Sequence, residues 1–343
     1  MRLIYDLTFS EIELLMKEWG EPVYRAHQVW EGIYRQYWNS PEQFSNIPIH
    51  IRRIMHENFE FKALSLITTL TSVDGQTVKS LFRLSDGKSI EAVLMRYDKR
   101  NTLCISSQAG CAMGCVFCAT GQMGFKSHLS SGEIVAQVIY YASLLRGEDE
   151  VVTNVVIMGM GEPFHNYDNT MAAIDRLNDP LGFNLGSRRF TISTVGLIPA
   201  IHRFAIEKRQ INLAISLHAA NDELRSSLLP INKRYPIDDL LSACREYINI
   251  TNRRVTFEWA LIDGVNDTSE QALLLANKLK GMLCHVNIIP LNLTYGYSGK
   301  ATTRENAEIF KQILIEHGIP CTIRLRRGID IQAGCGQLVS LSL

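Results

Sequence analysis

A repeated succession of strand, loop and helix from residue 101 onward constrains the fold more than any other feature of this sequence. Six runs rich in β-branched and apolar residues predict strands, and helical periodicity follows each of them. A strand, a crossover helix and the next strand normally pair in parallel with right-handed connections, so we predict an α/β fold. The predicted strands are Thr102–Ser106, Asn154–Met158, Arg189–Thr194, Ile211–Leu217, Val255–Ile262 and His285–Pro290.

The curvature of the predicted sheet is left open by periodicity, which does not distinguish a partial (βα)6 barrel from an open, doubly wound sheet. Polar residues and glycines gather after one strand after another, at the end where barrel enzymes place their sites. This placement favours the partial barrel.

Three of the predicted helices begin with a capping-box pattern, in which a capping residue lies three positions before a glutamate. The capping residues of these patterns are Ser130, Asp267 and Thr302. The last helix, beginning at Thr303, is predicted to stop at Gly318, because glycine readily ends a helix and a proline follows two residues later.

The first hundred residues predict two further units. Residues 8–60 have helical spacing of apolar side chains and are dense in aromatic and basic residues, which is typical of a small helical domain with an aromatic core. Residues 64–97 alternate as strands, with turns at Asp74-Gly75 and Asp86-Gly87. We therefore predict a helical domain over 1–62, a β extension over 63–97 and the barrel over 98–343.

Composition limits the cellular setting. The chain has 343 residues, of which 46% are hydrophobic and 20% charged, so disordered and fibrous classes are excluded. Its 35 basic and 35 acidic residues cancel, which excludes a polycationic coat protein but not local basic patches. No run of eighteen apolar residues occurs, and acidic residues interrupt the N-terminus, so we expect a cytoplasmic protein that does not enter the membrane, as a monomer.

Cysteine clustering is the strongest chemical signal. Four of the eight cysteines lie within fifteen residues, and three of them form Cys111-x-x-x-Cys115-x-x-Cys118. On a helix these three would share one face, but four glycines in the same stretch disfavour a helix. A glycine-rich loop with three thiols can instead wrap a metal centre. Zinc usually takes four ligands, whereas three thiolates on a cubane iron–sulfur cluster leave one iron open. Zinc and structural thiols are the alternatives to such a cluster.

Polar residues at the ends of the predicted strands form a second group of candidates. The loop after the second strand contains a glycine pair and Glu162, which could pair with an ammonium group. Each of these residues alone is typical of an ordinary strand end, but together they fall on one rim of the predicted barrel. The predicted cofactor-binding residues are Gly161, Glu162, Ser193, Ser216, Leu217, His218 and Asn292.

Longer motifs carry a resemblance to a known family. The cysteine spacing after a first barrel strand is similar to that of radical S-adenosylmethionine (SAM) enzymes. Three stretches resemble the RlmN/Cfr family of radical SAM methyltransferases of adenosine in RNA, and the likeness covers nearly the whole chain. These stretches are Cys104–Cys111, Phe117–Phe125 and Arg327–Leu338.

Details within these motifs resemble the RlmN branch, which methylates adenine at C2, more than the Cfr branch, which methylates C8 and confers antibiotic resistance. The segments concerned are Gln122–Phe125 and Gly161–Pro163. The chain departs from the common pattern at two places: Gly334 stands where many relatives have alanine, and a leucine follows Asn292 where proline is more usual.

The resemblance implies a mechanism with two cysteines outside the cluster. Cys111, Cys115 and Cys118 would hold a [4Fe–4S] cluster, and two SAM molecules would be used per turnover. Cys335 would accept a methyl group, Cys104 would resolve the adduct and form a disulfide with Cys335, and Glu91 would accept a proton.

The same resemblance implies the partners. They are 23S rRNA near the peptidyl-transferase centre, a tRNA adenosine beside the anticodon, and an external low-potential, flavodoxin-like electron donor. A non-catalytic iron–sulfur or zinc RNA-binding protein is the alternative from another class, but it would need neither Cys104 nor Cys335. The remaining cysteines, Cys244, Cys284 and Cys321, are predicted to be buried packing residues.

RNA binding by a chain without net charge requires local basic patches, each of which is also typical of an ordinary solvated surface. With an RNA substrate we expect them to contact phosphates, and the N-terminal aromatic residues to stack on a splayed base. The candidate patches are Arg188 with Arg189, Arg324 with Arg326 and Arg327, and Lys126 with His128.

Overall fold

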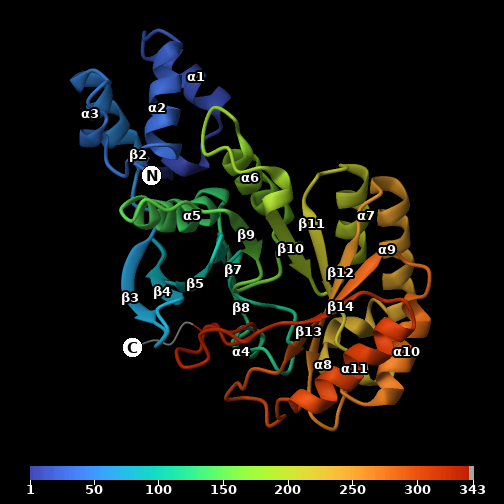
Figure 1. The fold of residues 1–343 in the computed structure, drawn as a ribbon. Helices are drawn as coiled ribbons and strands as arrows, with labels where there is room; N and C mark the ends of the chain where they lie inside the picture. The colour runs from blue at the N-terminus through green and yellow to red at the C-terminus, as the bar shows by residue number, and fades with distance from the viewer. Residues whose placement is uncertain (340–343) are drawn as a thin grey trace.

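Seven parallel strands form the larger part of a ten-stranded sheet in the computed structural model, which describes residues 1–339 (Figure 1). The six predicted strands are confirmed, each within two residues of its predicted ends, and a short seventh strand follows them. The parallel strands, in chain order, are β6 (Arg100–Cys104), β9 (Asn154–Ile157), β10 (Phe190–Thr194), β11 (Asn212–Ser216), β12 (Val255–Leu261), β13 (Cys284–Pro290) and β14 (Cys321–Ile323).

Strand order decides the question of curvature. Neighbouring strands in the sheet follow one another along the chain from β6 to β14 without a reversal. A doubly wound sheet reverses its order at a switch point, whereas a barrel does not. The prediction of a partial barrel is therefore confirmed.

Helices cover the outer face of these strands, as Figure 1 shows for α7, α9, α10 and α11. Each connects one parallel strand to the next, which gives the βα repetition seen in the sequence. The helices of the barrel are α5 (Ser131–Arg146), α6 (Tyr167–Asn178), α7 (Ile198–Ile206), α8 (Asp222–Leu228), α9 (Ile237–Thr251), α10 (Ser269–Leu279) and α11 (Arg304–Glu316), with 3-10 turns η3 (Ser187–Arg189) and η4 (Pro230–Lys233).

One of the three predicted capping boxes is confirmed. The hydroxyl of Ser130 accepts a hydrogen bond from the backbone of Glu133, whose carboxylate accepts one from Ser130 N–H. The predictions for the other two helices were wrong by one residue, because Thr268 caps α10 and Thr303 caps α11. The residues predicted as caps, Asp267 and Thr302, bond to each other at 2.6 Å.

The predicted β extension is present and continues the barrel sheet. Three antiparallel strands add to the edge at β6, and the turns between them lie at the predicted Asp-Gly pairs. The antiparallel strands are β3 (Ser65–Thr71), β4 (Thr77–Arg83) and β5 (Ser89–Tyr97). A small hairpin of β7 (Gln108–Gly110) and β8 (Phe125–His128), with α4 (Ala119–Gln122) between them, follows β6.

The N-terminal helices form a small unit with an aromatic core, packed against α5 and α6 (Figure 1). Trp30 and Tyr34 are buried, with ring centroids 4.3 Å apart. Arg176 of α6 donates to the carbonyl oxygens of Asp6 and Leu7, and Asp6 in turn accepts from the N-terminus of α5. The elements are α1 (Phe9–Glu18), α2 (Tyr24–Tyr34), α3 (Ile49–Asn58), β1 (Arg2–Leu3), β2 (Phe59–Glu60), η1 (Ile4–Asp6) and η2 (Pro41–Gln43).

The buried apolar side chains of the N-terminal unit, the extension and the barrel belong to one continuous core. The division of the chain at residues 62 and 97 therefore stays a prediction, because the core crosses both positions. None of the helices within residues 1–339 combines the length and the apolarity that a membrane crossing requires.

Side-chain alternation along the strands separates two environments. In β12, Phe257 and Trp259 are fully buried on the helix-covered side, where Trp259 packs on Phe310. Thr256 and Glu258 lie on the opposite side and line the barrel interior. Because successive side chains point to opposite faces of a strand, the sheet has an apolar outer face and a polar inner one.

We predict that Asp6→Ala destabilises the protein by about 1–2 kcal/mol, the usual cost of losing a side-chain cap at a helix N-terminus. Asp6 Oδ1 accepts from Gly132 N–H at 2.6 Å and from the hydroxyl of Ser131 at 2.9 Å. Urea-induced unfolding measures the change. Asp98→Ala, in an exposed turn, is the matched control, and equal losses for the two variants would contradict the role of Asp6.

Candidate active site

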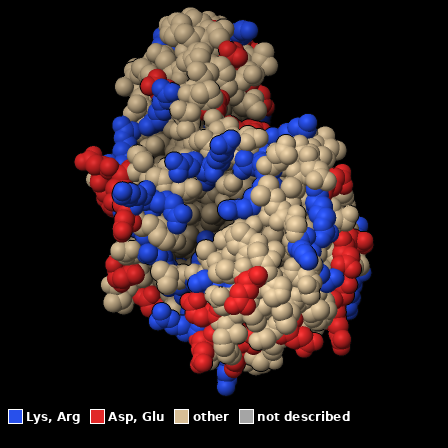
Figure 2. Space-filling view, turned by 45° about the vertical axis from the view of Figure 1, so that its right-hand side comes forward, with Lys and Arg blue, Asp and Glu red and all other residues tan. Residues whose placement is uncertain are grey.

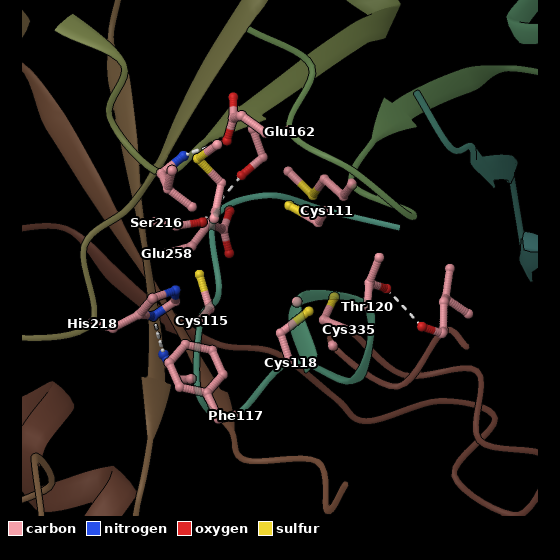
Figure 3. A pocket seen from close by; sticks show the side chains of 18 of the residues that line it. Cys111, Cys115, Phe117, Cys118, Thr120, Glu162, Ser216, His218, Glu258 and Cys335 are labelled. Carbon is pink, nitrogen blue, oxygen red and sulfur yellow. Dashed lines mark hydrogen bonds between the residues drawn. The ribbon is translucent and has the colours of Figure 1, made fainter. Parts of the chain in front are cut away.

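One cavity lies at the C-terminal ends of the parallel strands and collects most of the predicted site residues (Figure 3). Its wall combines the loop after β6, the loops after β9, β10 and β11, and the C-terminal segment. Figure 3 shows Cys111, Cys115 and Cys118 facing this cavity, with Cys335 beside Cys118. The barrel topology therefore brings together groups that lie more than two hundred residues apart in the sequence.

The three clustered cysteines lie on an irregular loop, as their glycine neighbours predict. Gly110 has a φ of +71°, and a side chain there would collide with the carbonyl oxygen of Gly124, so this crossing of the hairpin requires glycine. Burial raises the pKa of the Cys111 thiol to about 12 and also raises the pKa values of Cys115 and Cys118. Cys111 and Cys115 are buried and Cys118 is partly buried, so thiols around this cavity ionise more readily when a cation offsets their charge.

The donor set fits the cluster that the resemblance implies. Within residues 1–339, no three His, Cys, Asp or Glu side chains converge closely enough to hold a single ion. Thiolates on one zinc ion would lie within about 4 Å of one another, given the Zn–S bond length. Three thiolates around one cavity can each bind a separate iron of such a cluster.

Glu162 is a buried carboxylate on the cavity wall. Its two oxygens accept hydrogen bonds from the backbone N–H groups of Phe164 and Val195, at 3.0 and 2.9 Å. Burial raises its pKa to about 7, so the ionised form gains from a nearby cation. The neighbouring Gly161 has a φ of +102° and packs against Gln108, so the protein itself requires this glycine.

Ser193, Ser216 and His218 line the same cavity, as predicted. The hydroxyls of Ser193 and Ser216 lie 3.4 Å apart. His218 Nδ1 accepts from Ala260 N–H at 2.9 Å, and desolvation lowers its pKa to about 3, so the ring is neutral and its other nitrogen is a donor. Leu217 does not line the cavity, because strand alternation turns its side chain into the apolar core.

The C-terminal segment closes one side of the cavity and carries Cys335. Asn292 Nδ2 donates to the carbonyl oxygen of Cys335 at 3.1 Å, which confirms that Asn292 lies at the site. Ala119 N–H, next to the cluster loop, donates to the carbonyl oxygen of Gly336. The hydroxyl of Thr120 donates to the carbonyl oxygen of Leu338 at 2.6 Å, so the cluster loop and the segment are joined directly.

Cys104 lies at the end of β6 and shares a second, smaller cavity with Cys335. Burial raises the pKa of the Cys104 thiol to about 12. Cys335 is exposed by comparison. The fold thus places the two cysteines outside the cluster on one cavity wall, one buried and one accessible.

Glu91 does not line either cavity. Its carboxylate forms an ion pair with Lys79 at 3.1 Å and accepts from Val339 N–H at 2.8 Å. Lys79 also donates to the carbonyl oxygen of Gln332. This buried pair therefore holds both flanks of the segment that carries Cys335, and the role of Glu91 as proton acceptor stays a prediction.

Sequence reasoning missed Arg225, the residue that joins the loops beneath the cavity. Its fully buried guanidinium donates to the carbonyl oxygens of Leu217, Val195 and Ser216 and to the side chain of Asn232. Arginine in a helical stretch is ordinary surface composition, so the sequence carries no signal for this role. The three other cysteines, Cys244, Cys284 and Cys321, are buried as predicted.

The predicted basic patches divide into two kinds. Arg188, Arg189, Arg326 and Lys126 are exposed. Arg324 is partly exposed and lines three cavities of the barrel interior, so its predicted contact with RNA stays a prediction.

Arg327 is held by the protein itself. It donates to Gln76 and to the carbonyl oxygen of Arg96, and its guanidinium lies 4.3 Å from the centre of the Tyr97 ring. Figure 2 shows Lys and Arg side chains gathered around a hollow on one face of the molecule.

Comparison with known proteins bears on the identity of this site. A family model described as the radical SAM superfamily matches residues 105–276. The chain is 48% identical to the dual-specificity RNA methyltransferase RlmN 1 of Myxococcus xanthus, with 98% of this chain and 93% of that protein covered. It is also 48% identical to the probable dual-specificity RNA methyltransferase RlmN of Chloroflexus aurantiacus, with 98% and 92% covered.

A solved structure agrees with these sequence matches. A radical SAM methyltransferase from Sphaerobacter thermophilus superposes with a TM-score of 0.96 at 48% identity, with 98% of this chain and 99% of that chain covered. A non-catalytic RNA-binding protein is therefore not the correct interpretation. The chain belongs to the radical SAM superfamily, whose cofactors are a [4Fe–4S] cluster and SAM, and within it to the RlmN family of RNA methyltransferases.

Proposed function

We propose that this enzyme methylates C2 of an adenosine in 23S rRNA, near the peptidyl-transferase centre, and of an adenosine beside the tRNA anticodon. The observation that carries the proposal is the shared cavity wall of Cys104 and Cys335, next to the three cysteines of the cluster loop. Adenine C2 is an electron-poor sp² carbon without a lone pair to attack a methyl donor. A cysteine that carries the methyl group and a second thiol that releases the product provide a route that does not need such a lone pair.

Each cofactor would be held by residues that line the cavity. Cys111, Cys115 and Cys118 would bind three irons, and Glu162 would pair with the ammonium group of SAM. Ser193, Ser216, His218 and Asn292 would hold the rest of SAM. When bound, the cluster and SAM supply the electron, the methyl group and the radical that the reaction requires.

The protein's own groups would then act in order. The accessible Cys335 sulfur takes the methyl group from a first SAM and becomes a thioether. With SAM and the cluster bound, a hydrogen atom would be removed from that S-methyl group, the carbon would add to adenine C2, and the resulting radical adduct would give up one electron to the cluster. Cys104 would then assist removal of the C2 proton and, as a thiolate, would attack the sulfur of Cys335. The carbon–sulfur bond would break, the released carbon would keep the electron pair and take up a proton to become the methyl group, and a Cys104–Cys335 disulfide would form. An external flavodoxin-like donor would supply the two electrons that reduce it.

The adduct-resolving role requires Cys104 to lose its own proton inside the protein. Burial raises the pKa of this thiol to about 12, so the proton leaves only when a partner takes it or when the negative charge is passed on. A buried, protonated thiol is protected from stray oxidation until the base arrives. We place the enzyme in the cytoplasm, as a monomer.

A first prediction concerns the cluster. Anaerobic reconstitution should give about four irons per chain, and replacing Cys111, Cys115 or Cys118 by Ala should remove both the iron and SAM cleavage. Cys244→Ala is the matched control, because this buried cysteine lies in α9 and should keep the full iron content. Stoichiometric zinc without iron would contradict the assignment.

A second prediction separates the roles of Cys335 and Cys104. Cys335→Ala should carry no methyl group and form no RNA adduct. Cys104→Ala should still accept the methyl group and react with the base, then stall as a covalent protein–RNA complex, visible as a retarded band on a denaturing gel with labelled RNA. Normal turnover by Cys104→Ala would overturn the division of roles. Mapping of the methylated nucleoside by mass spectrometry separates C2 from the C8 product of a Cfr-like enzyme.

A third prediction concerns phosphate contacts. Arg254 and Arg326 are exposed. Arg254 also lines a further, polar cavity, which lies inside the barrel toward the N-terminal ends of the strands. Each should release about one counterion when it binds RNA, so Arg254→Ala and Arg326→Ala should each weaken binding and lower the salt slope by about one. Lys311→Ala, on α11 and paired with Glu308, is the control that should leave the slope unchanged. Binding that ignores salt would contradict the prediction.

A further inference from the structure

Glu258 of β12 and Arg324 after β14 lie inside the barrel, where two cavities meet. Both residues line the catalytic cavity at the C-terminal ends of the strands. Both also line the polar cavity toward the N-terminal ends, which is distinct from the small cavity of Cys104 and Cys335. Arg324 also lines the small cavity that contains Cys104 and Cys335. Arg324 therefore shares a cavity wall with Glu258 and another with Cys104 and Cys335.

The two opposite charges do not satisfy each other. Among the ion pairs within residues 1–339 none joins them, although Glu258 is only 5% exposed. Glu258 Oε2 and Arg324 Nη1 are both buried and have no hydrogen-bond partner in the described part of the chain. A buried charged group without a hydrogen-bond partner costs free energy of folding. Two such groups that do not bond to each other are therefore suited to binding a ligand between them.

Glu258 is held in place from behind. Asn287 Nδ2 donates to Glu258 Oε1 at 3.2 Å, and Asn287 Oδ1 accepts from the hydroxyl of Thr322 at 2.8 Å. His285 Nε2 bonds to the same hydroxyl at 2.9 Å. This chain of hydrogen bonds fixes one carboxylate oxygen, and the other, Oε2, is the one without a hydrogen-bond partner.

We infer that Glu258 and Arg324 read the edge of the target adenine, with Glu258 accepting from the N6 amine and Arg324 donating to N1. The inference rests on the proposed function. Along this edge of adenine the order of atoms is C2, N1 and then the carbon that bears N6. The protein offers the matching order: the two cysteines for C2, Arg324 for N1 and Glu258 for the amine.

This pair of groups also rejects other ligands. Guanine presents a carbonyl oxygen where adenine has its amine, and an N–H donor where adenine has N1. Its oxygen would then face the Glu258 carboxylate, and its N–H would face the Arg324 guanidinium. Such a mismatch leaves buried groups unpaired and discriminates strongly. A phosphate would suit Arg324 but would be repelled by Glu258. A flipped base read on this edge agrees with general practice in enzymes that modify bases.

Base analogues in a short RNA test the assignment. Replacing the target adenosine by purine riboside, which lacks the amine, should lower kcat/KM of the wild type about 10–100-fold, as expected for a hydrogen bond to a charged group. Glu258→Gln is nearly isosteric. It should lower the rate with adenosine by a similar factor and abolish the preference over purine riboside. Arg324→Met should in the same way remove the wild-type preference for adenosine over 1-deazaadenosine.

Methylation of Cys335 in the absence of RNA is the second readout, because this half-reaction needs SAM but no base. It should proceed normally in Glu258→Gln, whereas Arg324→Met, which removes a cation beside Cys335, is judged on the base preference alone. If Glu258→Gln loses this half-reaction while the preference for the natural base persists, Glu258 binds SAM and the inference is wrong. If the wild type methylates its cysteine but never adenosine, the proposed function fails, and this inference with it.

Discussion

The alternation of side chains along parallel strands is the constraint on which this active site depends. Hydrogen bonds between neighbouring strands keep them in register, so the same face of each strand turns inward. The outer face carries the apolar side chains that hold the helices, such as Phe257 and Trp259. The inner face is thereby free to carry polar groups that line the cavities, such as Ser193 and Glu258.

The incomplete closure of the barrel leaves a polar interior that the C-terminal segment partly covers. A closed eight-stranded barrel fills its interior with side chains, whereas this sheet ends at β14 and leaves a polar cavity inside. The C-terminal segment then covers part of the open end. It is held by the cluster loop through Thr120, by the loop after β13 through Asn292, and by the extension through Glu91 and Lys79. The extension therefore serves the site as an anchor, and Met95 and Tyr97 at the end of β5 also line the small cavity of Cys104 and Cys335.

Much of this arrangement could be predicted from the sequence, because it depends on local patterns. Strand runs, helix periodicity and the glycines around the cysteines are properties of neighbouring residues, and the barrel and the cluster loop follow from them. The errors share a different cause. Asp267 and Thr302 have the local signature of helix caps, but in the structure the hydroxyl of Thr302 donates to the carboxylate of Asp267. Arg225 and Lys79 look like surface charges until the tertiary structure buries them, Arg324 is only partly exposed inside the barrel, and Leu217 follows its strand into the core.

The anchoring of the C-terminal segment also bears on how the enzyme is made. The bond between Glu91 and Val339 spans 248 positions of the chain. At a synthesis rate of about 5–20 residues per second, the cluster loop leaves the ribosome roughly 10–40 s before Cys335 does. During that interval a nascent chain has the loop for iron but no methyl carrier. A chain that stops before Cys335 therefore lacks the methyl carrier, and it also lacks the segment that Ala119 and Thr120 of the cluster loop bind.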